Sequence, residues 1–224
     1  MLKQVASVAA LLTALTLSGT ASAALLTSDV GYTGPTLDLT AQQNGNYNFT
    51  FGPVGLPGGI TFTRDTTTAS NSGQGGVLGQ GGYGLAGNGS FGGDAVYAGL
   101  DGAEGWIRFA LSAPVSVFGL YVNYAPGVGP DPIIAALDQF GNVLEQYNLA
   151  TDAPVSTPGG FNEFQFRGIS LTAANIWTLQ LSNSYIIAAA SANGDPTPVP
   201  EPETLVMLAA GLFGLGFARR RRMH

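Results

Sequence analysis

The sequence predicts an all-β fold, an antiparallel β-sandwich of jelly-roll kind. Short stretches alternate apolar and polar residues, and Gly, Pro, Asn and Asp separate one stretch from the next. No stretch between residues 24 and 195 has the period of a helix of three turns. Alternation over a few residues with frequent turn signals is typical of sandwiches and jelly rolls, so nine or ten short strands are expected.

The alternation also predicts which side chains face the core, because successive side chains of a strand point to opposite faces. Strands are expected over 45–51, 60–64, 106–111, 116–124, 133–137, 143–147, 161–167, 176–181 and 185–190. The side chains predicted to be buried are Tyr47, Phe49, Phe51, Ile60, Phe62, Ile107, Phe109, Leu111, Phe118, Leu120, Val122, Phe164, Phe166, Trp177, Leu179 and Leu181. Asp138, Gly141 and Asn142 suit a hairpin loop between two of the strands.

The segment 65–105 differs from the rest because it holds fourteen glycines between Gly73 and Gly105. This composition predicts a long loop over the sandwich, or glycine-rich strands that fold against it. Residues 82–87 and 87–92 formally match the dinucleotide-binding fingerprint. We reject a nucleotide site, since that fingerprint needs a hydrophobic strand before it and a helix after it.

The N-terminal residues 1–23 are typical of a secretory signal peptide. Lys3 gives a short positive region, 5–17 is apolar, and Ala21 and Ala23 form a small-residue cleavage site. The alternative, an amphipathic helix of the folded domain, is disfavoured because the run is apolar all round. The sequence therefore predicts export and a domain that spans 24–195.

The C-terminal residues divide into three parts. Prolines at 196, 198, 200 and 202 make 196–203 an extended, Pro-rich stalk. An uncharged run then ends in Arg219, Arg220, Arg221 and Arg222, as on the cytoplasmic side of a membrane span. From Leu205 to Ala218 the run covers only about 21 Å as a helix, which is short for a hydrocarbon core of about 30 Å. We expect a short transmembrane helix that anchors the chain transiently in the inner membrane, with its C-terminus in the cytoplasm.

The motif Pro200, Glu201 and Pro202, with the apolar run and the arginine cluster, resembles the PEP-CTERM sorting signal of Gram-negative bacteria over about 198–222. The resemblance implies that exosortase, a membrane-embedded processing enzyme, is the partner and that 204–222 is the sorting signal. It also implies a host that makes extracellular polysaccharide. Residues 105–190 resemble, more loosely, the sandwich domains found ahead of such tails, which implies a distant likeness to carbohydrate-binding modules.

Charge and composition exclude several classes of function. Residues 24–195 carry three cations, Arg64, Arg108 and Arg167, against twelve acids, a formal charge of −9. Such a surface repels nucleic acid, whose binding needs phosphates to be neutralised. The sequence has no cysteine, which removes thiol nucleophiles and zinc-thiolate sites.

Few residues suited to catalysis are present, so the sequence predicts no catalytic residue and no enzyme. The one histidine is His224, beyond the arginine cluster, and this placement leaves no Ser-His-Asp triad in the domain. A carboxylate pair like that of glycosidases remains an alternative, with candidates Asp94, Asp101, Glu104, Asp131 and Asp138. No cofactor is predicted, and the metal question is open, with calcium at the loop acids as a hypothesis although no Asp-x-Asp-x-Asp-Gly run occurs.

Glycan binding is the hypothesis that the exposed aromatics favour, since sugar rings stack on aromatic faces while polar side chains contact hydroxyls. The residues predicted to do this on outward faces are Trp106 with Arg108 and Tyr121 with Asn123, with Tyr83 and Tyr97 as loop candidates. The alternative is that such aromatics are packed under a loop, or that a bulge reverses their face.

The sequence thus predicts a non-catalytic protein of the cell surface or extracellular matrix, exported and sorted through its tail, with weak binding of exopolysaccharide. The first alternative is a secreted glycan-active hydrolase with paired carboxylates. The second is an ice-binding type of surface protein, for which the threonines at 61, 63, 66 and 68 are the one supporting pattern.

Overall fold

The computed structural model describes residues 23–44, 46–68, 75–80, 83–85, 88, 90–91, 95–156 and 164–191. The predicted signal peptide 1–23, apart from residue 23, lies outside these ranges, and so do the predicted stalk 196–203 and the sorting signal 204–222. The described part is built of strands, with short 3₁₀ turns η1 (Thr40–Gln42) and η2 (Pro57–Gly59). Among the described residues, no helix is long and apolar enough to cross a membrane.

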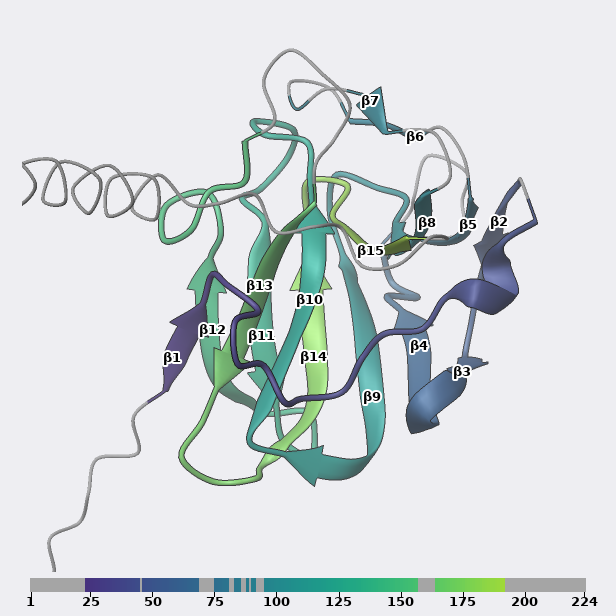
Figure 1. Cartoon of the computed structure of the whole chain (residues 1–224). Helices are drawn as coiled ribbons and strands as arrows, with labels where there is room; N and C mark the ends of the chain where they lie inside the picture. Colours follow the sequence, from purple (N-terminus) through teal and green to yellow (C-terminus); the bar gives the residue numbers. More distant parts are fainter. Residues whose placement is uncertain are drawn as a thin grey trace, which may run out of the picture.

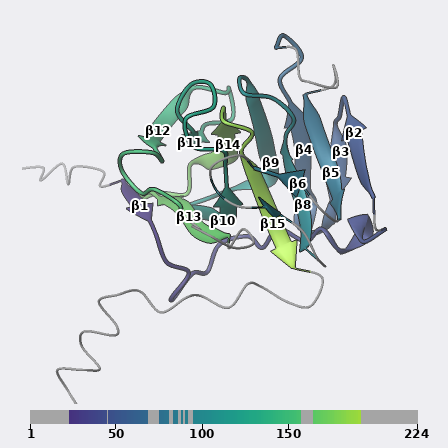
Figure 2. The ribbon, with the colours of Figure 1, turned by 90° about the horizontal axis from the view of Figure 1, so that it is seen from above.

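Two antiparallel sheets face each other, as the sequence predicts (Figures 1 and 2). The seven-stranded sheet has the order β1 (Ala24–Leu26), β13 (Gln165–Ser170), β10 (Val117–Asn123), β15 (Ile187–Ser191), β8 (Ala95–Leu100), β5 (Gly76–Gln80) and β2 (Tyr47–Thr50). The six-stranded sheet has the order β12 (Val143–Asn148), β11 (Ile133–Leu137), β14 (Ile176–Ser182), β9 (Trp106–Val115), β4 (Ile60–Arg64) and β3 (Val54–Leu56). Strands β6 (Tyr83–Gly84) and β7 (Ser90–Phe91) pair separately.

The last eight strands pair in the nested way that defines a jelly roll. Strand β8 pairs with β15, β9 with β14, β10 with β13, and β11 with β12, and these pairs alternate between the two sheets. Strands β1, β2 and β5 extend one sheet and β3 and β4 extend the other. The strands therefore outnumber the nine or ten expected because short strands extend the edges of the jelly roll.

The core lies between the sheets and contains most of the side chains that the alternation placed there. Ile60, Phe62, Ile107 and Phe109 of the six-stranded sheet meet Phe118, Leu120 and Val122 of the other. The predicted hairpin is also present, and both carboxylate oxygens of Asp138 accept hydrogen bonds from Asn142. These strands carry strict alternation, and the interface between the sheets buries their apolar side.

The face prediction is wrong for β13, where Phe166 lies on the outer face and Arg167 on the inner one. Register decides this, because Phe166 pairs with the outward Tyr121, and Arg167 pairs with the core residue Leu120. Arg167 is 4 % exposed, and its guanidinium donates hydrogen bonds to the carbonyls of Ala153, Pro154 and Phe166. A buried cation is tolerated here because backbone carbonyls and Gln165 satisfy its donors.

Trp177 and Phe51 are two further errors of the face prediction. The register of β14 against β9 shifts between Ile176 and Thr178, so Ile176 is fully buried and Trp177 is only half-buried. Such a bulge moves the following side chain off the expected face. Phe51 follows the end of β2 and is 61 % exposed, and its ring centroid lies 4.5 Å from the guanidinium carbon of Arg64.

Part of the glycine-rich segment 65–105 is sheet, which supports the alternative of glycine-rich strands. Strands β5 and β8 lie inside the seven-stranded sheet. On the outer face of that sheet, Tyr97, Val77, Ile187 and Ala189 form a second small core that Leu85 helps to cover. Gly99 fits there because a Cβ would lie 2.1 Å from Cγ2 of Ile187.

Candidate functional site

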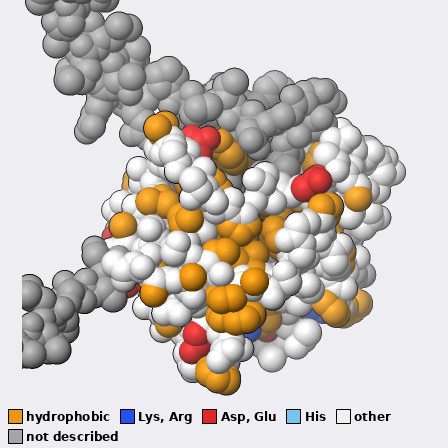
Figure 3. All heavy atoms as spheres, turned by 60° about the horizontal axis from the view of Figure 1, so that its bottom comes forward, with side chains coloured by type: hydrophobic (Ala, Val, Ile, Leu, Met, Phe, Trp, Pro, Cys, Tyr) orange, Lys and Arg blue, Asp and Glu red, His pale blue; other side chains and the backbone are white. Residues whose placement is uncertain are grey.

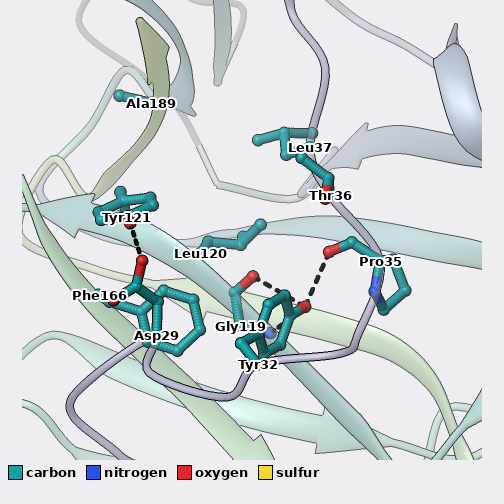
Figure 4. A pocket seen from close by; sticks show the side chains of 10 residues that line it. All are labelled: Asp29, Tyr32, Pro35, Thr36, Leu37, Gly119, Leu120, Tyr121, Phe166 and Ala189. Atoms are coloured by element: carbon teal, nitrogen blue, oxygen red, sulfur yellow. Dashed lines mark hydrogen bonds between the residues drawn. The ribbon is translucent and has the colours of Figure 1, made fainter. Parts of the chain in front are cut away.

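A concavity of the described surface lies on the outer face of the seven-stranded sheet (Figure 4). We call it the aromatic pocket, and its volume is about 230 Å³. Its lining residues are Asp29, Tyr32, Pro35, Thr36, Leu37, Gly119, Leu120, Tyr121, Phe166 and Ala189. Strands β10, β13 and β15 form the floor, and residues 27–39, the N-terminal strap, form the wall.

The strap crosses the sheet between β1 and η1, as Figure 1 shows. It begins with a tight turn in which Tyr32 N donates to Asp29 O at 2.9 Å, and Gly31 has φ +76°. The Tyr32 hydroxyl then donates to Pro35 O at 2.7 Å and accepts from Gly119 N at 3.1 Å. These bonds fix the strap to β10 and keep the pocket open between them.

Three aromatic rings form one side of the pocket. The Phe166 ring packs edge-on against Tyr32 at 5.0 Å and against Tyr121 at 5.5 Å between ring centroids. Gly119 makes room for this packing, since a Cβ there would lie 2.3 Å from Cζ of Phe166. Edge-to-face rings in contact stabilise one another by about 0.5–1.5 kcal/mol beyond their burial.

The polar side chains that line the pocket are those of Asp29, Thr36, Tyr32 and Tyr121. The Tyr121 hydroxyl donates to Oδ2 of Asp29, and in Figure 4 the two side chains point toward each other. Thr36 and Leu37 lie across the pocket from Tyr121. The arrangement therefore offers ring surface next to hydrogen-bonding groups, which is what a sugar ring requires.

Burial raises the pKa of Tyr32 to about 12, while the hydrogen bond with Gly119 lowers it in part. The unfolded chain loses this proton near pH 10, so from about pH 10 to 12 the unfolded state binds fewer protons. Stability therefore falls with rising pH across that window. After discounting for solvent, we expect a loss of about 1 kcal/mol.

Urea unfolding of the wild type and Tyr32→Phe at pH 9 and pH 11.5 tests this expectation. The variant lacks the titrating group, so its free energy of unfolding falls less between the two pH values than that of the wild type. Equal losses in the two proteins would contradict the assignment.

The side chains of Trp106 and Arg108 face outward on β9, as predicted. The alternate residues of the strand, Ile107 and Phe109, lie in the core. The guanidinium carbon of Arg108 lies 4.0 Å from the centroid of the Trp106 ring. Arg108 Nε donates to Gln180 Oε1 at 2.8 Å. We call Trp106, Arg108 and Gln180 the arginine platform; it lies on the opposite outer face from the aromatic pocket.

The prediction that Asn123 is exposed beside Tyr121 is wrong. Asn123 is 0 % exposed, and its Oδ1 accepts hydrogen bonds from the Asn88 side chain and from Tyr124 N. The glycine-rich segment supplies Asn88 and so covers this end of β10. Tyr97, a loop candidate, is buried in the second core, and the side chain of Tyr83 lies outside the described residues.

Asp29, Tyr32 and Phe166 are site residues that the sequence did not reveal. Asp29 and Tyr121 are 92 residues apart, and the strap has no regular secondary structure over 27–39. Phe166 belongs to an alternating stretch, but alternation does not tell which face a strap covers. Only the fold brings these side chains together.

The described residues contain no group of three or more His, Cys, Asp or Glu side chains placed to hold a metal ion. Of the carboxylate candidates, Asp131 accepts a hydrogen bond from the Asn148 side chain, and Asp94 lies outside the described ranges. Asp138 is held by its own hairpin, and those hydrogen bonds lower its pKa. Calcium at the loop acids therefore stays a hypothesis.

Comparison with known proteins bears on the tail. A family model described as the PEP-CTERM protein-sorting motif matches residues 198–222. The chain carries a PEP-CTERM motif. Exosortase recognises this motif, which implies an exported protein sorted to the cell envelope or surface. No curated protein and no solved structure matches the chain.

The PEP-CTERM match covers the stalk end and the arginine cluster, whereas both surface sites lie in the jelly roll. The motif thus concerns where the protein goes and which enzyme processes it. The surface of the domain itself determines what the domain binds. Charged side chains are few on the face shown in Figure 3.

Proposed function

We propose that this PEP-CTERM protein is a non-catalytic protein of the cell surface or extracellular matrix that binds exopolysaccharide weakly in the aromatic pocket. The observation that carries the proposal is the combination of Tyr32, Tyr121 and Phe166 with the Asp29 carboxylate in one hollow. The rings offer a surface for the apolar face of a sugar, the Asp29 carboxylate can accept hydrogen bonds from its hydroxyl groups, and the Thr36 hydroxyl can donate to them.

The size of the pocket favours weak binding of a short part of a polymer. Its volume of about 230 Å³ is below the roughly 300–1,000 Å³ typical of pockets that enclose drug-sized ligands. A single sugar ring fits such a space better than a longer oligosaccharide. Avidity from many copies along one polymer would strengthen a weak single contact.

The lining of the pocket favours binding over hydrolysis. Asp29 is the one carboxylate among its lining residues, and it already accepts a hydrogen bond from the Tyr121 hydroxyl. Glycosidases use two carboxyl groups about 5–10 Å apart, one of which acts as the acid. The hydrolase hypothesis therefore lacks support from this pocket.

Export supplies the setting for the proposal. We propose that the N-terminal signal is cut after Ala23 and that the tail helix holds the chain in the inner membrane, with its C-terminus in the cytoplasm. Exosortase would then act near Pro200, Glu201 and Pro202 and free the domain for the envelope or matrix. The matched motif supports the sorting step, and the membrane steps are part of the proposal.

Binding by the protein recovered from outside the cell tests the proposal, and its intact mass records which ends have been removed. We expect retention on immobilised neutral polysaccharides such as dextran, mannan and galactan, without release of sugar. Tyr121→Ala should weaken binding roughly tenfold, as loss of a central aromatic contact does.

Phe140→Ala is the matched control, because Phe140 is 79 % exposed on the β11–β12 hairpin and is not among the residues that line the pocket. It should bind as the wild type does. Unchanged binding by Tyr121→Ala, or an equal loss in both variants, would refute binding in the pocket. Accumulation of a cleavage product would refute the non-catalytic role.

A further inference from the structure

Arg108 is the one cation of residues 24–195 that is not buried. That segment has three basic residues, and the other two, Arg64 and Arg167, are 5 % and 4 % exposed. Both donate to backbone carbonyls, Arg64 to Thr50 O and Asp65 O and Arg167 to the loop after β12. These two arginines stabilise the fold. An anion that binds to a side-chain cation of this domain therefore binds to Arg108.

The guanidinium of Arg108 is held in a fixed orientation. It lies over the Trp106 ring at 4.0 Å, and its Nε is bonded to Gln180. Gln180 is itself oriented, since its Nε2 donates to Ser182 Oγ at 3.1 Å. The strand register places Gln180 opposite Arg108 and Ser182 opposite Trp106, so four side chains on two strands form a single chain of contacts.

The terminal nitrogens of Arg108 are left for a ligand. Its bond to Gln180 uses Nε, and among the described residues no hydrogen bond from Nη1 or Nη2 is found. Two parallel N–H groups match the two oxygens of a carboxylate, and a guanidinium already held in place loses little freedom on binding. The platform is thus prepared for one planar anion beside a tryptophan ring.

Asp65 is the charged neighbour that competes for Arg108, and its hydrogen bonds limit that competition. Its carboxylate accepts from Thr67 N, Thr67 Oγ1 and Thr68 Oγ1. Burial lowers the pKa of Arg108 and the charge of Asp65 opposes that effect. Three donors already satisfy Asp65, so it does not need the guanidinium fork.

We propose that the arginine platform binds the carboxylate of a uronic acid residue, so that the polysaccharide partner is an acidic glycan. This inference rests on the proposed function and adds a second contact with the polysaccharide, on the opposite outer face from the aromatic pocket, that selects polymers carrying uronic acid residues. The ring of the sugar lies beside Trp106 while its carboxylate takes Nη1 and Nη2 of Arg108. The remaining acidic surface repels a polyanion at long range, but this repulsion is screened beyond about 8 Å at physiological salt.

Polygalacturonate and its fully methyl-esterified form provide the test, because esterification removes the carboxylate charge and keeps the sugar backbone. The full chain in detergent micelles is titrated with each polymer and with dextran by calorimetry. We expect polygalacturonate to bind at least tenfold more tightly than the ester. Arg108→Gln should lose this preference, a loss of roughly ten- to a hundredfold for a charge-assisted pair.

Two further variants distinguish the effect of the planar guanidinium from the effects of positive charge and of altered stability. Arg108→Lys keeps the charge without the planar fork and should recover only part of the preference, and Phe140→Ala should keep all of it. Thermal midpoints of all variants are compared. If Arg108→Gln does not fold, the comparison of ester and acid on the wild type still tests the inference.

Equal binding of the acid and the ester by the wild type, or full preference in Arg108→Gln or Arg108→Lys, overturns the inference. Binding of dextran with no preference for polygalacturonate would be consistent with the proposed function but would contradict an acidic ligand. Failure to bind any of the polymers removes both.

Discussion

Phe109→Ala is expected to lower the free energy of unfolding by about 3–5 kcal/mol. Phe109 is fully buried in the middle of β9, and its ring centroid lies 5.7 Å from that of Phe62 on the neighbouring strand β4. Truncation removes the ring from the interface between the sheets and leaves a cavity that the paired strands cannot close. Since a domain is typically stable by only about 5–15 kcal/mol, the loss is a large share of the total.

Urea unfolding followed by tryptophan fluorescence measures the loss. Phe140→Ala, the same change at a largely exposed position, should alter stability by less than about 0.5 kcal/mol. A cost below about 1 kcal/mol for Phe109→Ala would contradict the assigned core, since buried aromatic truncations cost several times that.

Gly168→Ala is expected to destabilise the domain by about 2–3 kcal/mol through overpacking. Gly168 of β13 pairs with Gly119 of β10, and a Cβ at Gly168 would lie 2.8 Å from Gly119 Cα and 2.9 Å from Phe118 O. These are backbone atoms, so relief requires the two strands to separate. That separation would also disturb the pocket floor.

Gly55→Ala is the matched control in β3, because a Cβ there meets nothing within 4 Å. It should be neutral or slightly stabilising, as alanine reduces the freedom of the unfolded chain. Thermal unfolding of the two variants side by side gives the comparison. Equal midpoints would show that β10 and β13 are not in the described register.

The sequence could predict the strands that alternate strictly, because the interface between two sheets imposes that pattern. It therefore identified Phe62, Phe109 and Phe118 as core, and also the Asp138 hairpin. It failed where a face is buried by something other than the opposite sheet. Phe166 is apolar because the strap covers it, and Arg167 is inside because loop carbonyls satisfy its donors.

Local irregularity accounts for the remaining errors in the fold. The register shift between β14 and β9 turns Trp177 away from the core, and no residue in that stretch of the sequence indicates the shift. Strands β5 and β8 are poor in β-branched residues, so their composition resembles a loop, although glycine at 99 is what lets Ile187 approach.

The candidate sites show the same division. The arginine platform could be anticipated because Trp106 and Arg108 are two residues apart on one face of one strand. The aromatic pocket could not, since its residues come from the strap, β10, β13 and β15. Sequence named Tyr121 alone of its aromatic rings as a binding residue.

Hydroxyl-radical footprinting of the exported protein, with and without bound exopolysaccharide, tests the central claim most directly, because it reports which side chains the polymer covers. We expect protection of Tyr32 and Tyr121 in the pocket, unchanged oxidation of Phe140 on the hairpin, and an intact polymer. Unchanged oxidation of both tyrosines while polymer is bound, or shortening of the polymer, would contradict a non-catalytic protein that binds glycan in the aromatic pocket.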